Sequence, residues 1–305
     1  MSSSPSKLSS SRLSDKLWRL IVIALPYWWL LIFFLAPFAI VFKISFADPI
    51  VAQPPFTDFF NASNDSTGWL LATFDNYRFL TEDNLYWISY LKSIKVAAIS
   101  TLLCLLLGYP MAYAIARSTP VVRNILLMLV ILPFWTSFLL RVYAWMGMLG
   151  KNGLINNLLI SIGAIDTPME MLYTDTAVYI GIVYTYIPFM ILPLYATLEK
   201  LDLNLHDAAA DLGAKPWQVF IDVTLPMSKP GIIAGSLLVF IPALGEYVIP
   251  ALLGGIDSLM IGRTLYDEFF VNRDWPLASA VATVLLLIIV VPIMLFQRSQ
   301  QEEIE

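Results

Sequence analysis

The chain alternates between long apolar segments and shorter polar ones. An α-helix needs about 20 mostly apolar residues to cross a bilayer. The segments that meet or nearly meet this length are Leu20–Phe42, Ile94–Ala116, Ile125–Met148, Ala177–Leu198, Gly231–Ala251 and Leu277–Phe296. The pattern predicts an all-α integral membrane protein with six transmembrane helices. Its parts would be a polar tail at 1–19, a transmembrane domain at 20–296 and a second tail at 297–305.

The distribution of basic residues predicts the orientation of these segments. Lys and Arg are enriched on the cytoplasmic side of membrane proteins. With a cytoplasmic N-terminus, the cytoplasmic pieces hold 10 of the 18 Lys and Arg residues, and the short loop Arg117–Arg123 is the cleanest instance. An even number of spans returns the C-terminus to the same side. We therefore expect both termini and the polar segment 200–230 to be cytoplasmic.

Composition agrees with a membrane protein and excludes several other classes. The chain is 58% hydrophobic and only 13% charged, with a mean hydropathy of +0.73. A soluble domain has about 25% charged residues, so most of this chain is expected to contact membrane lipid. The net charge of −5 argues against nucleic-acid binding, which uses basic patches. With one His and one Cys, no transition-metal site is expected.

The polar segment 207–226 has a regular internal spacing. The run D-A-A at 207–209 is followed after three residues by Gly213, and after nine more by V-T-L-P at 223–226. Asn204 or Asp207 is expected to cap a short helix, since a small polar side chain there accepts from free N–H groups.

Glycine and proline predict where the helices of this segment end. Gly213 is expected to close the first helix in a left-handed turn. Pro216 can start a second helix and Pro226 stop it. The pattern thus predicts two short helices joined at a glycine, lying across the membrane face.

This spacing resembles the EAA loop of binding-protein-dependent ABC importer permeases, E-A-A-x3-G-x9-I-x-L-P. Asp207 replaces the Glu of that pattern and Val223 replaces its Ile. In that family the loop receives mechanical work from a separate ATPase. The resemblance implies an ATPase-coupling role for Asp207, Ala208, Ala209, Asp211, Gly213, Leu225 and Pro226. The alternative is an ordinary cytoplasmic loop whose acidic side chains are only solvated.

Nucleotide and nucleophile motifs are missing from the sequence. There is no G-x-x-x-x-G-K-[ST] phosphate loop and no G-x-S-x-G elbow. We therefore expect a non-catalytic chain that binds no cofactor, with ATP and Mg²⁺ used by a partner ATPase.

The resemblance extends over nearly the whole chain after about residue 20 and is weakest in the first outer loop. The runs LLLGYPMAYAIAR, ILPFWTSFLLRVYAW and FIPALGEYVIPALLGG are similar to the polyamine branch of the family, closest to its PotH-type putrescine permeases. This implies a MetI-like permease fold in the bacterial inner membrane. It also implies a second related permease as heterodimer partner, two ATPase subunits and a periplasmic polyamine-binding protein.

A path for an aliphatic dication needs carboxylates, carbonyls and aromatic faces. Glu246 is the acidic residue most clearly inside a predicted span, where a charge costs roughly 3 kcal/mol on insertion scales. Pro242, Gly245 and Pro250 are expected to break the helix around it. We hypothesise that Glu246 lines the translocation path. The alternatives are a structural ion pair, with Arg141 as a possible partner, or an interfacial position.

Aromatic side chains in or near the spans could attract ammonium groups. They are Trp135, Tyr143, Trp145, Tyr184 and Tyr186. Trp and Tyr also populate membrane interfaces for reasons unrelated to cargo. Arg141 would repel a dication, so it is expected to bind a carboxylate or helix-end carbonyls and to shape a gate.

Three other functions are alternatives. A stand-alone secondary carrier or channel would need no ATPase, and the spacing at 207–226 argues against it. A scaffold or sensor would use that loop only for docking, and Glu246 with the proline-broken spans argues against it. The same machinery carrying spermidine or another small solute stays open, because a binding protein selects the cargo first.

Overall fold

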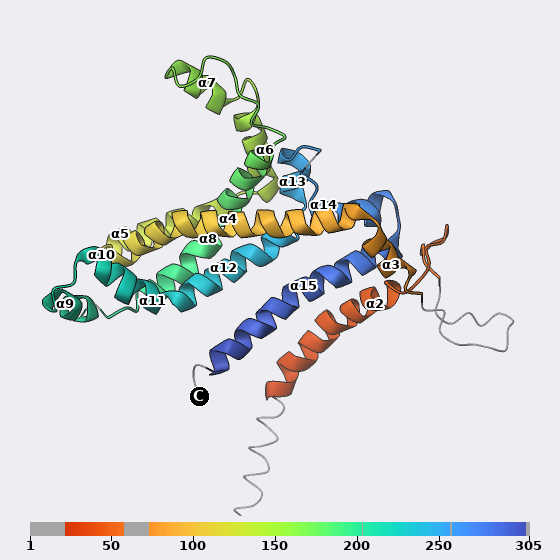
Figure 1. The fold of residues 1–305 in the computed structure, drawn as a ribbon, viewed down its shortest axis with the longest axis horizontal. Helices are drawn as coiled ribbons and strands as arrows, with labels where there is room; N and C mark the ends of the chain where they lie inside the picture. Colours follow the sequence, from red (N-terminus) through yellow and green to blue (C-terminus); the bar gives the residue numbers. More distant parts are fainter. Residues whose placement is uncertain (1–21, 58–72, 203, 257, 303–305) are drawn as a thin grey trace, which may run out of the picture. The chain divides into compact units, whose positions relative to one another are not determined.

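The computed structural model describes residues 22–57, 73–202, 204–256 and 258–302, and these residues are almost entirely helical (Figure 1). The predicted tail at 1–19 lies outside them. The predicted C-terminal tail continues the last helix as far as Glu302. The chain divides into two compact units, Thr81–Asp267 and a unit made of Met1–Leu80 with Glu268–Glu305.

The unit made from the two ends of the chain pairs its first helix with its last. η1 (Leu31–Leu35) and α2 (Ala36–Ile44) belong to a continuous helix that begins at Val22, and α15 (Trp275–Glu302) packs against α2 (Figure 1). The π-helical turn ends two residues before Pro37, which has no N–H for a regular helical bond.

Hydrogen bonds join α3 (Asp75–Glu82) to the residues that follow α2. Asn76 Nδ2 donates to the carbonyl oxygen of Ser45 at 3.0 Å and to that of Ala47 at 2.8 Å. The unit also contains η4 (Asp267–Val271) at its boundary.

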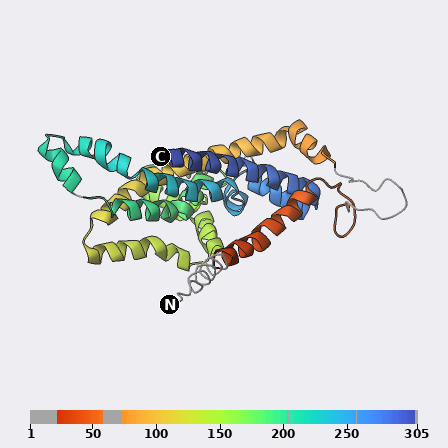
Figure 2. The ribbon, with the colours of Figure 1, turned by 90° about the horizontal axis from the view of Figure 1, so that it is seen from below.

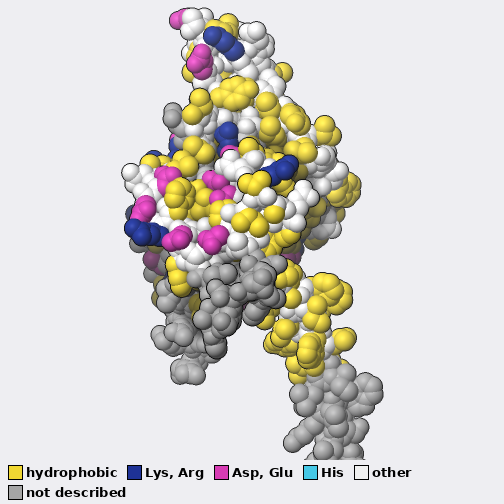
Figure 3. All heavy atoms as spheres, turned by 90° about the vertical axis from the view of Figure 1, so that its right-hand side faces the viewer, with side chains coloured by type: hydrophobic (Ala, Val, Ile, Leu, Met, Phe, Trp, Pro, Cys, Tyr) yellow, Lys and Arg dark blue, Asp and Glu magenta, His cyan; other side chains and the backbone are white. Residues whose placement is uncertain are grey.

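The first helix presents apolar side chains in every direction. No residue is buried in the most apolar 18-residue stretch of the helix Val22–Ile44. Its side chains form the yellow surface at the lower right of Figure 3. A helix that is apolar all round is suited to lipid or to a partner helix.

Three long helices form the core of the other unit. They are α4 (Asn84–Arg117), α8 (Asp175–Leu198) and α12 (Lys229–Leu244), which lie side by side (Figures 1 and 2). Their contact is filled by large apolar side chains, among them Tyr109 of α4, Met190 and Leu194 of α8, and Val239 of α12. Buried apolar contact of this kind is the main stabilising term that such a bundle has.

The predicted span Ile125–Met148 is not one straight helix. α5 (Pro120–Ile131) runs into η2 (Leu132–Trp135), and α6 (Phe138–Leu149) begins after a bend of 92°. Pro133 removes an N–H at this point. α7 (Leu154–Ser161) follows α6.

The predicted span Gly231–Ala251 is also interrupted. α12 ends at Leu244 and α13 (Val248–Leu253) follows, which confirms the helix break expected around Glu246. Pro250 lies inside α13 and does not end it. α14 (Ile261–Tyr266) comes next.

Three helices among the described residues are long and apolar enough to cross a membrane by themselves. They are Val22–Ile44, Asn84–Arg117 and Asp175–Leu198. Up to five spans result if each of two bent helix pairs counts as one, and Trp275–Val290 is a shorter apolar helix. The protein is therefore an all-helical membrane protein with three to five candidate spans by length and composition.

Candidate functional site

The polar segment 204–228 folds as predicted into two short helical pieces joined at a glycine. α9 (Asn204–Asp211) ends in a turn where Gly213 has φ +86°. The N–H of Ala214 donates to Ala209 O at 3.1 Å and the N–H of Gly213 to Ala210 O at 2.9 Å. These two bonds form a Schellman motif, which needs the left-handed conformation that glycine adopts at low cost.

The second piece consists of α10 (Pro216–Val219), η3 (Phe220–Thr224) and α11 (Leu225–Met227), which follow one another without a gap. It ends one residue after Pro226, as expected, and the chain bends by 64° before α12 begins at Lys229.

The expected N-terminal cap of α9 was also misplaced. The helix begins at Asn204, so Asp207 lies inside its first turn and is exposed. The N–H of Asn204 donates instead to Asp202 Oδ1 at 3.0 Å. Asp207 is therefore free to meet a partner, with its charge near the positive end of the helix dipole.

The outer face of this segment is rich in exposed apolar side chains. Leu212 is 90% exposed and Trp217 60%. Asp211 is exposed beside them. Exposed apolar side chains next to acidic ones are typical of a surface that contacts another protein.

Side chains of the segment 204–228 also contact α4. The ring of Phe220 meets the rings of Tyr109 and Tyr113 edge-on, at centroid distances of 5.6 Å and 6.2 Å. The Tyr109 hydroxyl and Ser228 Oγ are 2.9 Å apart. Movement of the segment therefore acts directly on the carboxyl-terminal part of α4.

His206, the only histidine of the chain, makes a further link. Its Nδ1 lies 3.0 Å from Arg117 Nη2, at the last residue of α4, and its Nε2 lies 3.0 Å from Thr224 Oγ1. Burial lowers the pKa of the imidazole below its usual value, Arg117 lowers it further, and Asp207 opposes them. The imidazole is therefore neutral near pH 7.

Glu246 sits in the gap between α12 and α13 and is 8% exposed. Its Oε1 accepts from the backbone N–H groups of Val248 at 3.0 Å and Ile249 at 3.3 Å. Its Oε2 accepts from the Tyr186 hydroxyl at 2.5 Å. The carboxylate thus satisfies free donors at the start of α13 and faces the aromatic side chain from α8.

The ion pair considered between Glu246 and Arg141 is not found in the described part of the chain. Arg141 lies instead near the rings of Phe134 and Phe138, at 5.9 Å and 5.8 Å from their centroids. Its Nε is buried and has no hydrogen-bond partner among the described residues. The guanidinium group of Arg141 therefore makes cation–π contacts with these two rings instead of an ion pair with a carboxylate.

The predicted aromatic residues do not form one cluster. Tyr186 contacts Glu246, and Trp145 and Tyr184 pack edge-on at 5.4 Å. Trp135 is 74% exposed and Tyr143 55%. The structure therefore brings Tyr186 to the carboxylate and leaves Trp135 and Tyr143 on the surface of this chain.

An aromatic stack beside Glu246 was not predicted from the sequence. Tyr247 stacks on Tyr266 of α14, with centroids 4.0 Å apart and planes inclined by 16°. A Cβ on Gly262 would lie 2.4 Å from Gly245 O and 2.7 Å from Glu246 O, so α14 packs directly on the helix break. In the sequence, the only signal for this stack is that Tyr247 directly follows Glu246.

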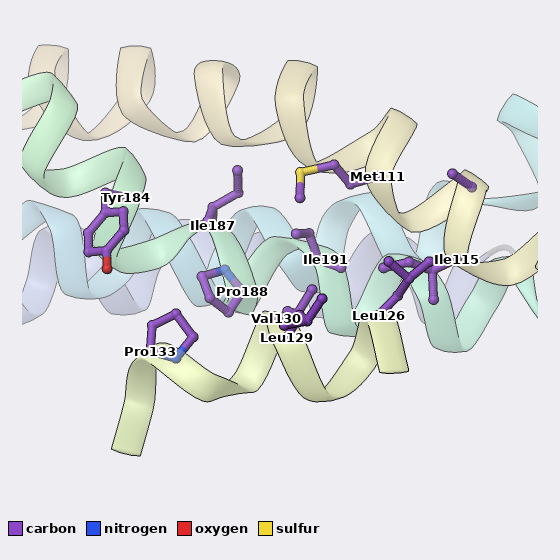
Figure 4. Close-up of a pocket in the computed structure, with 11 residues that line it drawn as sticks. Met111, Ile115, Leu126, Leu129, Val130, Pro133, Tyr184, Ile187, Pro188 and Ile191 are labelled. Carbon is purple, nitrogen blue, oxygen red and sulfur yellow. The ribbon is translucent and has the colours of Figure 1, made fainter. Parts of the chain in front are cut away.

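An apolar cavity of about 420 Å³ lies between α4, α5 and α8 (Figure 4). Figure 4 shows Met111 and Ile115 facing Leu129 and Val130, with Pro188 between the helices. No charged side chain lines it. A cation would be unfavourable there because nothing compensates its loss of hydration.

Comparison with known proteins identifies the family. Residues 104–301 match the model of the binding-protein-dependent transport system inner membrane component. The chain belongs to this family. It is a non-catalytic permease of the inner membrane, and membership implies an ATPase and a binding protein as partners.

Two curated relatives of this permease are similar over most of their length. The spermidine/putrescine transport system permease protein PotB of Haemophilus influenzae is 39% identical over 92% of this chain and 93% of its own. PotB of Escherichia coli K12 is 41% identical over 80% of this chain and 89% of its own.

A solved structure has the same fold as this permease. It is a chain of a bacterial alginate ABC transporter in complex with an alginate pentasaccharide-bound periplasmic protein. The TM-score is 0.68, the identity 18%, and the match covers 98% of each chain.

Proposed function

We propose that this chain is a permease subunit of an ATP-driven polyamine importer. Its similarity to two PotB proteins, at about 40% identity over most of each chain, is the observation that carries the cargo class. Putrescine is the cargo that the PotH-type sequence runs favour, and spermidine is the alternative. Both are flexible aliphatic cations that a carboxylate with aromatic neighbours can bind.

The coupling role is assigned to the segment 204–228. Asp207, Asp211 and the exposed apolar side chains would meet an ATPase, with Ala208 and Ala209 allowing close approach. Gly213 sets the angle between the helices, and Leu225 and Pro226 lie where the segment joins α12. Its contacts with α4 support this role, because a push on the segment displaces a helix that spans the whole unit.

The cargo path is assigned to the region of Glu246. A buried carboxylate at a helix break, within a membrane-spanning segment, is the strongest attraction for an ammonium group that this unit offers. Tyr186 of α8 contacts it, Tyr184 lies on the same helix, and Trp145 of α6 packs against Tyr184. Trp135 and Tyr143 would join the path only in the assembled transporter, where Arg141 would act at the gate.

The assembly that this function needs has further members. We infer a heterodimer with a second related permease, two ATPase subunits that use ATP and Mg²⁺, and a periplasmic polyamine-binding protein. This chain itself would bind no cofactor. It would cross the membrane six times in a MetI-like arrangement, with both termini cytoplasmic.

Uptake in cells tests the cargo assignment. A bacterial strain without polyamine importers would express the chain with its partner permease, ATPase and binding protein, and uptake of labelled putrescine and spermidine would be measured. We expect uptake of at least one of the two, which disappears when this chain alone is omitted. If neither is imported while the complex assembles in the membrane, the polyamine assignment is wrong.

A further inference from the structure

The single histidine of the coupling segment lies between two parts of the protein that must move together. His206 contacts Arg117 through Nδ1 and Thr224 through Nε2, each at 3.0 Å. A guanidinium group carries only donors, so Nδ1 must accept from it. The hydrogen is therefore on Nε2, which donates to the Thr224 hydroxyl.

We propose that His206 is the positioning residue that fixes α9 to the carboxyl end of α4 and that its protonation uncouples ATP hydrolysis from transport. This inference rests on the proposed coupling role of the segment 204–228. It adds that the contacts of His206 with Arg117 and Thr224 transmit the motion, and that protonation of the imidazole breaks them.

α9 depends on this link because little else holds it. The helix has eight residues, and isolated helices of fewer than about 12 are marginal in water. Its side chains Leu205, Asp207 and Ala208 are exposed. His206 and Ala209 are half-buried, and the partner of His206, Thr224, is 1% exposed. The imidazole therefore links a largely exposed helix to a buried side chain.

The link reaches the region of Glu246 through α4. Near the opposite end of that helix, Ser93 Oγ accepts from the N–H of Ile261 at 2.7 Å, and Ser89 Oγ lies 3.3 Å from Thr264 Oγ1. Both partners belong to α14, which packs on the helix break that holds Glu246. A displacement of α9 would thus be carried along α4, which is continuous from Asn84 to Arg117, to the proposed cargo site.

Protonation destroys the link. A second ring hydrogen on Nδ1 would face the Arg117 donor, so an acceptor is lost and two cations meet. The charged group that α4 presents is Arg117, α9 itself presents Asp207, and η3 presents the uncharged Thr224. The Asp207 carboxylate favours the protonated imidazole, whereas the Arg117 guanidinium and burial favour the neutral one.

The direction of the pH dependence follows. The pKa of His206 in the docked state is lowered, while the free imidazole has its usual value near 6.5. The link is therefore complete above about pH 6.5 and weakens as the pH falls through the lowered pKa. Acidification on the ATPase side should reduce coupling.

The test measures cargo imported per ATP hydrolysed. Proteoliposomes would contain the complete transporter, with the ATPase side held at about pH 7.5 or about pH 5.5, values on either side of the imidazole pKa. We expect His206→Ala to lower the ratio about tenfold at the higher pH, since Ala keeps the helix but removes both hydrogen bonds. His206→Gln, which can still accept and donate, should restore most of the ratio and abolish its pH dependence.

A second pair of variants guards against misfolding. Thr224→Val keeps the buried shape and removes the hydroxyl, and Thr224→Ser keeps the hydroxyl. We expect the first to lower the ratio and the second to preserve it, while both assemble with the ATPase. If His206→Ala and Thr224→Val import as much cargo per ATP as the wild type, or if His206→Gln keeps the wild-type pH dependence, the proposal is wrong.

The same assay separates this inference from the proposed function. If Gly213→Ala and ATPase omission both leave uptake unchanged, the coupling segment itself has been misassigned. If those changes abolish coupled uptake while the His206 variants behave as wild type, only the role of His206 fails.

Discussion

At the scale of single residues, Glu246 is the group on which the cargo path depends. The sequence identified it because an acidic residue inside an apolar span is costly. The structure adds that the carboxylate holds the start of α13 and accepts from Tyr186. The partner considered from the sequence, Arg141, was wrong, because sequence separation says nothing about which helix faces meet.

Neutralising Glu246 separates its charge from its structural role. Gln at this position can still accept from the N–H groups of Val248 and Ile249, so the helix break should persist. We expect Glu246→Gln to reduce polyamine uptake about tenfold or more, the size of a lost charge-assisted contact. Labelled uptake at equal membrane expression measures it.

A matched control for this variant is Glu170→Gln, since Glu170 is exposed and pairs only loosely with Lys151 at 3.8 Å. It should transport as the wild type. Normal uptake by Glu246→Gln would remove the carboxylate from the cargo path and leave it a structural role in capping α13.

At the scale of secondary-structure elements, local turn chemistry was readable from the sequence and continuity was not. The left-handed turn expected at Gly213 is confirmed, because few residues other than glycine adopt that conformation. Pro226 predicted the end of the second piece to within one residue, because proline has no N–H to continue a helix. The 92° bend after α5 needed tertiary structure, since Pro133 predicts a break but not its angle.

The contact of α14 with the helix break gives a test at this scale. A methyl group on Gly262 would lie 2.4 Å from the carbonyl oxygen of Gly245, so the backbone would have to shift. Overpacking of this kind costs about 1–3 kcal/mol. We therefore expect Gly262→Ala to lower both the thermal stability and the uptake rate.

The measurement compares Gly262→Ala with Gly147→Ala, because a methyl group on Gly147 would meet no atom within 4 Å. Melting of the purified complexes and labelled uptake would be recorded for both. Wild-type stability and uptake in Gly262→Ala would contradict the close packing of α14 on this break.

At the scale of the whole molecule, composition and hydrophobic pattern were sufficient for the class, and the spacing at 207–226 indicated the family, but neither predicted the arrangement of the spans. Within the described residues each of the six apolar segments contains helix, but two of them are interrupted, and three helices are long and apolar enough to cross a membrane by themselves. The links between the coupling segment and α4 could not be predicted, because His206, Phe220 and Ser228 find their partners only when distant segments pack.

ATP-dependent accumulation of a polyamine tests the central claim most directly. Proteoliposomes with the complete transporter would receive labelled putrescine on the binding-protein side, with ATP, without ATP, or with an ionophore that removes ion gradients. We predict accumulation above the external concentration only with ATP, insensitive to the ionophore. It should be strongly reduced in Gly213→Ala, because a left-handed alanine costs about 1–2 kcal/mol and alters the coupling turn. Accumulation without ATP that the ionophore abolishes would contradict the account and make the chain part of a secondary carrier.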